Sequence, residues 1–537
     1  MALLAVVGLS ATACSNGPGE DSAEDAKNAG PKSTDYFGYM VNTRLATTNA
    51  GTSFGNATNA AQLSSRLYPG IYMPGPSGQM IPNSDLVQTE EIPASPENPY
   101  KQVNFTLSEQ ATFSDGIPVT CDDYLLAYTA GVMPAEFGSH MPLTSEIAQF
   151  DCAPNAKKFT ITFNKDQGDR WRYLFGPGTV MPAHAVAKKA GMNLEELNAA
   201  LSTQDPASLQ QVAETWRYGF STTAEDFDPA LQVSFGPFVV DKVGESGEVI
   251  LRANEEYFGD QPATDKVVVW PNTADAKALR ESGNLRVVDA GSAKPKWLPA
   301  ADEASPYEGG ATAGGVSATF TLLQAGVFQE PWARQAFAAC IDQSRLAKVS
   351  SDISGVDVPP VYARTLRHSD PVGTHLGDIA DAHKKPDMTK ASELSGNTIK
   401  IGYLGPDERY AAMVEEIKAM CEPAGITVED QSSEYMSQYY LEMDPATWTP
   451  TIDAFLGPVD PMSEYATPDA DISNLKEIRG AEEKLWEDVP SIPVAAQPRV
   501  FIVDRNVKGV VPYTGSAGIG WNMDRWAVSA SVSASAS

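Results

Sequence analysis

Cysteine and histidine, the side chains that most often serve as nucleophiles or metal ligands, are few in this chain. There are five of each, namely Cys14, Cys121, Cys152, Cys340, Cys421, His140, His184, His368, His375 and His383. The cysteines form no CxxC pair, and the histidines lack the HExxH or zinc-finger spacing that holds a metal ion. P-loop and GxGxxG patterns are also missing from the sequence. We therefore expect no enzyme activity, no metal site and no cofactor.

The first cysteine follows a short apolar segment. Residues 2–13 are mostly apolar and end in three small residues directly before Cys14. A segment of 12 residues is too short to span a bilayer and is typical of a signal-peptide core. Small residues ahead of a cysteine resemble a bacterial lipobox, which implies a lipid anchor on Cys14 and a location on the extracytoplasmic face of the cell membrane. Because no lysine or arginine precedes Lys27, we expect translation to start further upstream.

The composition is that of a globular, exported protein. Of 537 residues, 42% are hydrophobic and 20% are charged, which excludes bulk disorder and predicts several domains. The 69 acidic and 39 basic residues give a formal charge of −30. Such a surface repels nucleic-acid phosphates, so nucleic-acid binding is disfavoured. We interpret the charge as a solvated acidic exterior that keeps the protein soluble.

Strands and helices alternate along the chain. Short runs rich in β-branched and aromatic residues predict strands at residues 35–41, 102–107, 158–164, 237–243, 248–253 and 266–270. Apolar periodicity predicts helices at residues 59–68, 121–132, 194–216 and 332–340. A strand at 398–404, a helix at 408–421 and a strand at 426–430 are expected to form one β-α-β unit. This alternation predicts α/β lobes.

Four sequence blocks, in order, resemble bacterial solute-binding family 5, the extracellular binding proteins of oligopeptide and dipeptide importers. They are VNFTL with FSDGIPVTCDD (103–107, 113–123), FGPF with LRANEEYFG (235–238, 251–259), RQAFAACID (334–342) and DVPSIPV with NVKG (488–494, 506–509). Any one block is a weak signal, since DGxP is a turn before a capped helix. The resemblance rests on the fact that all four blocks occur in the order of the family, along most of the chain.

The resemblance implies an α/β fold of the periplasmic-binding-protein-like type II, a two-lobed clamp of cluster C with an extra domain inserted in lobe one. The expected divisions are a signal peptide (1–13), a flexible tether (14–34), lobe one in three segments (35–70, 229–290, 495–526), an inserted domain (71–228), lobe two (291–494) and a low-complexity tail (527–537). The tail alternates Ser, Ala and Val and gives no reason to pack.

The cysteines after Cys14 can pair in three ways. Because an extracytoplasmic compartment lets disulfides persist, we expect all four to be paired. The pairs Cys121–Cys152 and Cys340–Cys421 are favoured, since each would then lie within one lobe of the implied fold.

In peptide-binding relatives, an Asp shortly before a DP-like turn of lobe two holds the α-amino group of the ligand through a charge-assisted bond. The matching position here is Gly457, ahead of Asp460 and Pro461. Either Asp453 or Asp460 substitutes for that Asp, or the usual amine anchor is absent. The candidate ligand-binding positions are therefore Asp453, Gly457 and Asp460. The prediction of a peptide ligand rests on less than the prediction of the fold does.

Other candidate contacts come from both lobes. Aromatic side chains near the same stretch are suited to stacking on sugar rings or apolar groups. Packing in the core is an alternative of equal weight. These residues are Tyr439, Tyr440, Trp448 and Tyr465. In lobe one, the hydroxyl and amide groups of Thr48 and Asn49 follow the first strand, where they suit a neutral polar ligand.

The function implied by the resemblance is capture rather than catalysis. A peptide or other small solute would bind between the lobes, favour the closed state and be delivered to ABC permease subunits. We expect a monomer that is held to the membrane through Cys14. The alternative is a non-transport relative that binds or regulates lipid-linked mannosides, in phosphatidylinositol mannoside or lipoarabinomannan synthesis, in an actinobacterial cell envelope. A secreted hydrolase is disfavoured because the sequence has no HExxH motif.

Overall fold

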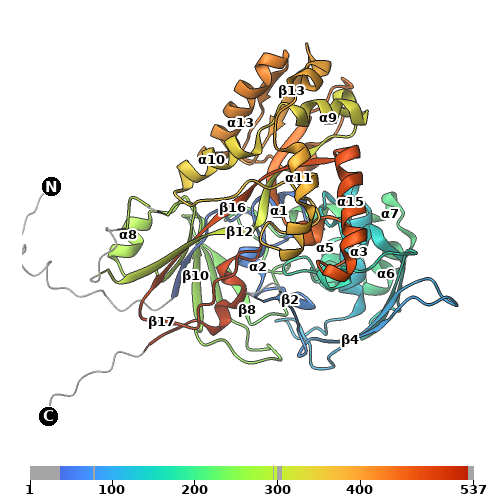
Figure 1. The fold of residues 1–537 in the computed structure, drawn as a ribbon. Helices are drawn as coiled ribbons and strands as arrows, with labels where there is room; N and C mark the ends of the chain where they lie inside the picture. Colours follow the sequence, from blue (N-terminus) through green and yellow to red (C-terminus); the bar gives the residue numbers. More distant parts are fainter. Residues whose placement is uncertain (1–36, 76–78, 294, 299–304, 530–537) are drawn as a thin grey trace, which may run out of the picture.

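The computed structural model describes residues 37–75, 79–293, 295–298 and 305–529. In this part of the chain the protein is a two-lobed α/β clamp, as the sequence predicts (Figure 1). Below, lobe one denotes the described residues of 37–290 and 495–529, and lobe two denotes those of 291–494. The predicted signal peptide, the tether and Cys14 lie outside the described residues. No helix within the described ranges combines the length and apolar character that crossing a membrane requires.

One mixed sheet runs through both lobes. Within the described residues its ten strands lie in the order β14-β13-β15-β12-β16-β11-β1-β10-β9-β8. Their bounds are β1 (Phe37–Met40), β8 (Phe238–Val243), β9 (Val249–Ala253), β10 (Lys266–Trp270), β11 (Val287–Ala290), β12 (Tyr307–Leu322), β13 (Thr398–Gly402), β14 (Thr427–Asp430), β15 (Ala454–Val459) and β16 (Ser491–Asp504). The predicted β-α-β unit is confirmed, because β13 pairs in parallel with β14.

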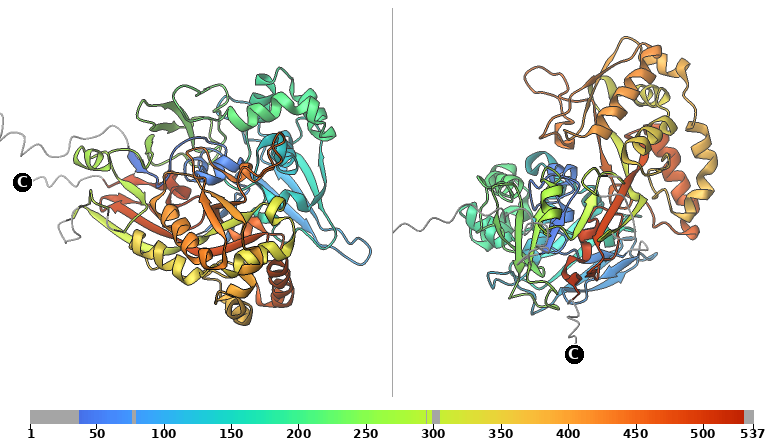
Figure 2. Two further views of the ribbon diagram at one scale, coloured as in Figure 1. Left: turned by 90° about the horizontal axis from the view of Figure 1, so that it is seen from above. Right: turned by 90° about the vertical axis from the view of Figure 1, so that its left-hand side faces the viewer.

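The long strands β12 and β16 connect the lobes. They pair antiparallel, with Tyr307 opposite Asp504 at one end and Thr321 opposite Ser491 at the other. Near its lobe-one end β16 pairs with β11, while the other end of β12 pairs with β15. The register of the pair shifts between Ala313 and Ser317, near the passage from one lobe to the other. In the right-hand view of Figure 2 lobe two lies above lobe one, and the strands run between them.

The inserted part of lobe one carries its own antiparallel sheet, in the order β4-β5-β7-β6. Its strands are β4 (Val87–Ile92), β5 (Gln102–Leu107), β6 (Ile147–Cys152) and β7 (Lys158–Phe163), and its helices are α3 (Cys121–Val132), α4 (Pro134–Phe137), α5 (Ala183–Lys189), α6 (Leu194–Thr203) and α7 (Pro206–Tyr218). A small hairpin of β2 (Tyr72–Pro74) and β3 (Met80–Pro82) precedes it.

Helices cover the sheet of lobe two (Figure 1). They are α9 (Pro331–Ala339), α10 (Gln343–Ser354), α11 (Gly377–His383), α12 (Met388–Ala391), α13 (Glu408–Cys421), α14 (Pro461–Glu464) and α15 (Leu475–Asp488). The remaining part of lobe one contributes the short helices α1 (Ser53–Ala57), α2 (Ala61–Ser64) and α8 (Ala276–Glu281), and a C-terminal hairpin of β17 (Val507–Lys508) and β18 (Ala527–Val528).

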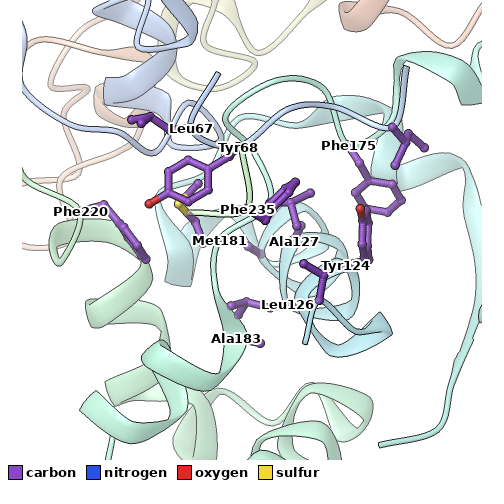
Figure 3. Close-up of a cluster of buried hydrophobic side chains, with 14 of the residues drawn as sticks. Leu67, Tyr68, Tyr124, Leu126, Ala127, Phe175, Met181, Ala183, Phe220 and Phe235 are labelled. Atoms are coloured by element: carbon purple, nitrogen blue, oxygen red, sulfur yellow. The ribbon is translucent and has the colours of Figure 1, made fainter. Parts of the chain in front are cut away.

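The insertion and the rest of lobe one share one hydrophobic core. Figure 3 shows Leu67 and Tyr68, from before the insertion, in one cluster with Tyr124 and Phe175 from within it. The ring of Tyr68 also contacts that of Phe235, which follows the insertion. A second buried cluster lies on the other side of the clamp and is drawn mainly from lobe two. Since apolar burial is the main stabilising term, the shared core makes the insertion and lobe one a single body.

Three sequence predictions need correction. The helix expected at residues 194–216 is two helices, α6 and α7, because Pro206 cannot donate a backbone hydrogen bond and Asp205 caps the new helix. The helix expected at 59–68 is reduced to α2: it starts later because Asn59 has a positive φ of 49°, and residues 65–67 form turns. The tail was expected to be unpacked from residue 527, but Ala527 and Val528 pair with β17.

Both favoured disulfides are present. Cys121 at the start of α3 is bonded to Cys152 at the end of β6, within the insertion. Cys340, just after α9, is bonded to Cys421 at the end of α13, within lobe two. All four thiols are therefore occupied, and the cluster of Cys121, Asp122 and Cys152 offers no free thiolate to a metal ion.

Candidate functional site

A cavity of about 160 Å³ lies between the lobes. Lobe one lines it with Asn56 of α1 and with Tyr173 and Phe175 of the insertion, and lobe two lines it with Val316 of β12 and Asp460. The C-terminal segment adds Tyr513 and Ser516. Segments far apart in the sequence therefore converge on one space, which is where a two-lobed clamp holds a small molecule.

On the lobe-two side, Arg367 and Asp460 form a bidentate ion pair. Arg367 Nη2 lies 2.8 Å from Asp460 Oδ2, and Nε lies 3.2 Å from Oδ1. Burial lowers the pKa of Arg367, but the neighbouring Asp460 carboxylate outweighs this effect and leaves the pKa raised. Asp460 also caps α14 by accepting the Met462 N–H at 3.1 Å. Both oxygens of the Asp460 carboxylate thus accept hydrogen bonds from groups of lobe two.

His140 and Glu464 form a second pair, and this one joins the lobes. His140 Nε2 lies 2.8 Å from Glu464 Oε2, and the two side chains are 17% and 16% exposed. The His140 backbone N–H donates to Gly51 O, which holds the histidine on lobe one. Burial lowers the pKa of His140, but Glu464 raises it by charge and hydrogen bonding, and the net pKa is raised. The pair therefore favours the charged imidazolium in the closed clamp.

Arg170 forms a third junction between the lobes. This side chain of the insertion is 1% exposed and donates to four backbone carbonyls of lobe two, those of Thr365 (2.6 Å), Pro461 (2.7 Å), Pro468 (3.2 Å) and Tyr465 (3.3 Å). Burial lowers the pKa of Arg170, while Asp469 and Asp460 at longer range favour the charge. The Arg170 guanidinium thus exchanges its hydrogen bonds to water for hydrogen bonds to backbone carbonyls of the opposite lobe.

A loop of lobe two, residues 431–451, reaches lobe one on another side. Arg44 pairs with Glu434 across the lobes at 3.3 Å. The Arg217 guanidinium lies over the Tyr439 ring, 3.6 Å from its centroid. An ion pair and a cation–π contact therefore also join the lobes on this side.

Of the predicted ligand-binding residues, the cavity contains only Asp460. Gly457 lies inside β15, opposite Thr319 of β12, and does not line the cavity. Asp453 is 2% exposed, and its Oδ2 accepts the Lys400 N–H at 2.8 Å, so it supports the start of β15. Burial raises the pKa of Asp453.

The other three predicted residues lie outside the cavity. Thr48 Oγ1 donates to Gln232 Oε1 at 2.8 Å, and Asn49 Nδ2 donates to Trp216 O at 2.8 Å, so both side chains brace the loop after β1. Trp448 is 76% exposed in the 431–451 loop. The neighbouring Ala50 lines the cavity in place of Thr48 and Asn49.

Sequence reasoning missed Arg170, His140, Glu464 and Arg367, which carry the charges of the closed clamp. None belongs to a motif, and each pairs with a group from 93 to 324 positions away. The sequence offered one signal, the two arginines Arg170 and Arg172 at the start of an aromatic and glycine-rich stretch around residues 170–178. This pattern indicates an unusual position but does not identify the partner of either arginine.

Comparison with known proteins gives a consistent result. A family model described as bacterial extracellular solute-binding proteins, family 5 middle, matches residues 94–470. An uncharacterized lipoprotein of Mycobacterium tuberculosis H37Rv is 27% identical over 534 residues, covering 91% of this chain and 92% of the relative.

Two solved structures show the same fold. The binding protein AgaA of A. tumefaciens R10, in complex with agropinic acid, has a TM-score of 0.65 at 16% identity and covers 92% of this chain and 99% of its own. The oligopeptide-binding protein AppA of Bacillus subtilis, in complex with a nonapeptide, has a TM-score of 0.62 at 13% identity and covers 92% and 100%.

Proposed function

This chain belongs to the bacterial extracellular solute-binding proteins of family 5, and from that premise we propose that it is the receptor of an ABC importer. It captures a peptide or a similar small solute between its lobes and presents the closed form to the permease. The members and neighbours of this family described above are binding proteins, and the cavity chemistry requires no bond to be made or broken.

The observation that carries the proposal is the cavity that both lobes line together. A solute that contacts both sides binds the closed state more tightly than the open state and so shifts the population toward closure. The long strands β12 and β16 are the continuous connection about which such closure takes place.

A direct test is to recover the solute. The mature protein is purified from its native host without denaturation, and native mass spectrometry then measures the mass of any bound molecule. We expect one stoichiometric small molecule that is released on denaturation and restores a raised melting temperature when added back. Uptake of that molecule should fail in a deletion strain and return with the wild-type gene. Undiminished uptake in the deletion strain would contradict the importer role.

The proposed location is the outer face of the membrane, through a lipid on Cys14. Supporting it are the small residues before Cys14 and the lipoprotein names of the mycobacterial relatives. The acidic surface then faces solvent, and a tether of about 20 residues permits the clamp to approach a permease.

A further inference from the structure

We infer that the cleft selects an uncharged solute and excludes a ligand held by a free ammonium or carboxylate group. This inference rests on the proposed function and narrows it to a ligand class. It follows from the partners of the charged side chains that line the cavity.

Each charged side chain that lines the cavity has a partner within the protein. They are His140, Arg172, Arg367, Asp460 and Glu464. Arg367 is paired with Asp460, and His140 with Glu464. Arg172 Nη2 lies 3.0 Å from Glu91 Oε2 and stacks over the Trp171 ring. A charged ligand group therefore meets a site whose cations and anions already neutralise one another.

Closure makes this arrangement selective. A ligand charge enclosed between the lobes loses its water and needs an opposite charge in return. To supply one, the protein has to break a buried pair such as Arg367 with Asp460, which leaves the other partner uncompensated. A neutral ligand carries no such penalty, because it needs hydrogen bonds and apolar contact only.

The groups that remain free in the cavity are neutral. Within the described residues, the side chains of Asn56, Asn59 and Ser516 line the cavity and form no hydrogen bond. These amides and this hydroxyl can both donate and accept. Apolar residues such as Met141, Leu143 and Val316 line the cavity beside them.

The size of the cavity agrees with a compact ligand. Its volume of about 160 Å³ is close to that of an engineered cavity of about 150 Å³ that holds benzene. A single ring with hydroxyl or amide substituents, such as a monosaccharide or a cyclic dipeptide, combines this size with neutral donors and acceptors. These candidate ligands share one chemical property, which is that none of them carries a charged group.

The first experiment separates charged from uncharged solutes. Small molecules from a bacterial cell hydrolysate are passed over mixed-bed ion-exchange resin, which retains ionisable species, zwitterionic peptides included. The flow-through and the eluate are each tested for their effect on the melting temperature of the mature protein. We expect the flow-through to raise it and the eluate to leave it unchanged.

Two other outcomes are informative. If the eluate stabilises the protein as much as the flow-through or more, the inference is overturned while the solute-binding function stands. If neither fraction stabilises it at saturating concentration, both the inference and the proposed function are contradicted. A matched pair then tests the charge alone: linear Gly-Gly with free termini against the cyclic dipeptide of Gly-Gly, with the cyclic form expected to bind at least tenfold more tightly.

A variant tests the cause. In Arg367→Met the Asp460 carboxylate loses its ion-pair partner, so the cleft should gain affinity for amine-bearing molecules of the eluate. The double variant Arg367→Met, Asp460→Asn should lose that gain. Arg505→Met, at an exposed pair with Glu308, controls for the loss of an arginine elsewhere. If the folded Arg367→Met protein, checked by circular dichroism, gains no amine binding, charge pairing is not what excludes amines.

Discussion

Arg170 links the lobes through dipoles rather than through a carboxylate. Its four acceptors are carbonyl oxygens of lobe two, and the side chain is almost fully buried. Backbone acceptors cannot be lost by a single side-chain change in lobe two, so the junction depends on the arginine alone. Contacts within the protein thus contribute to holding the lobes together.

Replacing this arginine should loosen the clamp. In Arg170→Met four hydrogen bonds from a charged donor are lost, each worth about 1.5–3 kcal/mol, so the ratio of closed to open molecules should fall by at least about 10-fold. Hydrogen–deuterium exchange of amides in residues 459–468 measures this ratio, and their exchange should accelerate by the same factor. The exposed Arg505→Met variant should exchange like the wild type. Equal exchange in Arg170→Met would show that the other junctions hold the lobes without it.

The His140–Glu464 pair predicts a pH dependence. The pKa of His140 in the folded protein is raised above 6.5, so its contribution is fully present below about pH 6.5 and is lost as the pH rises through the folded pKa. A hydrogen bond between charged groups is worth about 1.5–3 kcal/mol. The melting temperature of the wild type relative to His140→Gln should therefore be higher at pH 5.5 than at pH 8.5.

Other histidines change with pH in the opposite sense, so the comparison with His140→Gln is essential. Burial lowers the pKa of His368, and burial with nearby cations lowers that of His383 to about 4. Both remain in the variant, and their effects cancel in the difference. A difference in melting temperature that is constant between pH 5.5 and 8.5 would mean that the pair does not titrate in this range.

At the scale of elements, each disulfide fixes a different part of the clamp. Cys121–Cys152 ties α3 to β6 across 31 positions, and Cys340–Cys421 ties the end of α9 to the end of α13 across 81 positions. Neither crosses from one lobe to the other. The cross-links therefore stiffen each lobe while they leave the long strands β12 and β16 as the connection between them.

Loop-closure entropy predicts the cost of removing each disulfide. In the chain-entropy relation the 81-position loop corresponds to about 4.5 kcal/mol and the 31-position loop to about 3.7 kcal/mol. Unfolding in urea, followed by tryptophan fluorescence, should show a greater loss for Cys340→Ala with Cys421→Ala than for Cys121→Ala with Cys152→Ala. The second double variant is the matched control. The opposite order would indicate that packing around the cysteines outweighs the entropy of the unfolded chain.

At the scale of the whole molecule, the lipid anchor proposed on Cys14 decides where the clamp works. In Cys14→Ala the acyl chains cannot be attached, and none of the helices in the described residues is long and apolar enough to cross the membrane in their place. We expect this variant in the culture medium, whereas wild type and Ser15→Ala stay with the membrane fraction. Immunoblots of the two fractions measure the partition. Retention of Cys14→Ala in the membrane would contradict the lipid anchor.

The sequence by itself determined the family, the two-lobed fold and the β-α-β unit of β13, α13 and β14. These rest on local signals, namely short blocks in a fixed order and apolar periodicity. The cysteines alone left three pairings open, and the lobes that the resemblance implies favoured the pairing that the structure contains. Its errors were also local, as at Pro206, where the helical pattern continued past a residue that ends a helix.

Only the tertiary structure decided which charges meet. Arg367 and Asp460 are 93 positions apart, and Arg170 and Thr365 are 195 apart, so no periodicity relates them. Closure of the lobes brings them together, and burial then makes each pair strong enough to define the cleft. For the same reason Thr48, Asn49 and Asp453, plausible ligand contacts by composition, are occupied by internal hydrogen bonds in the folded chain.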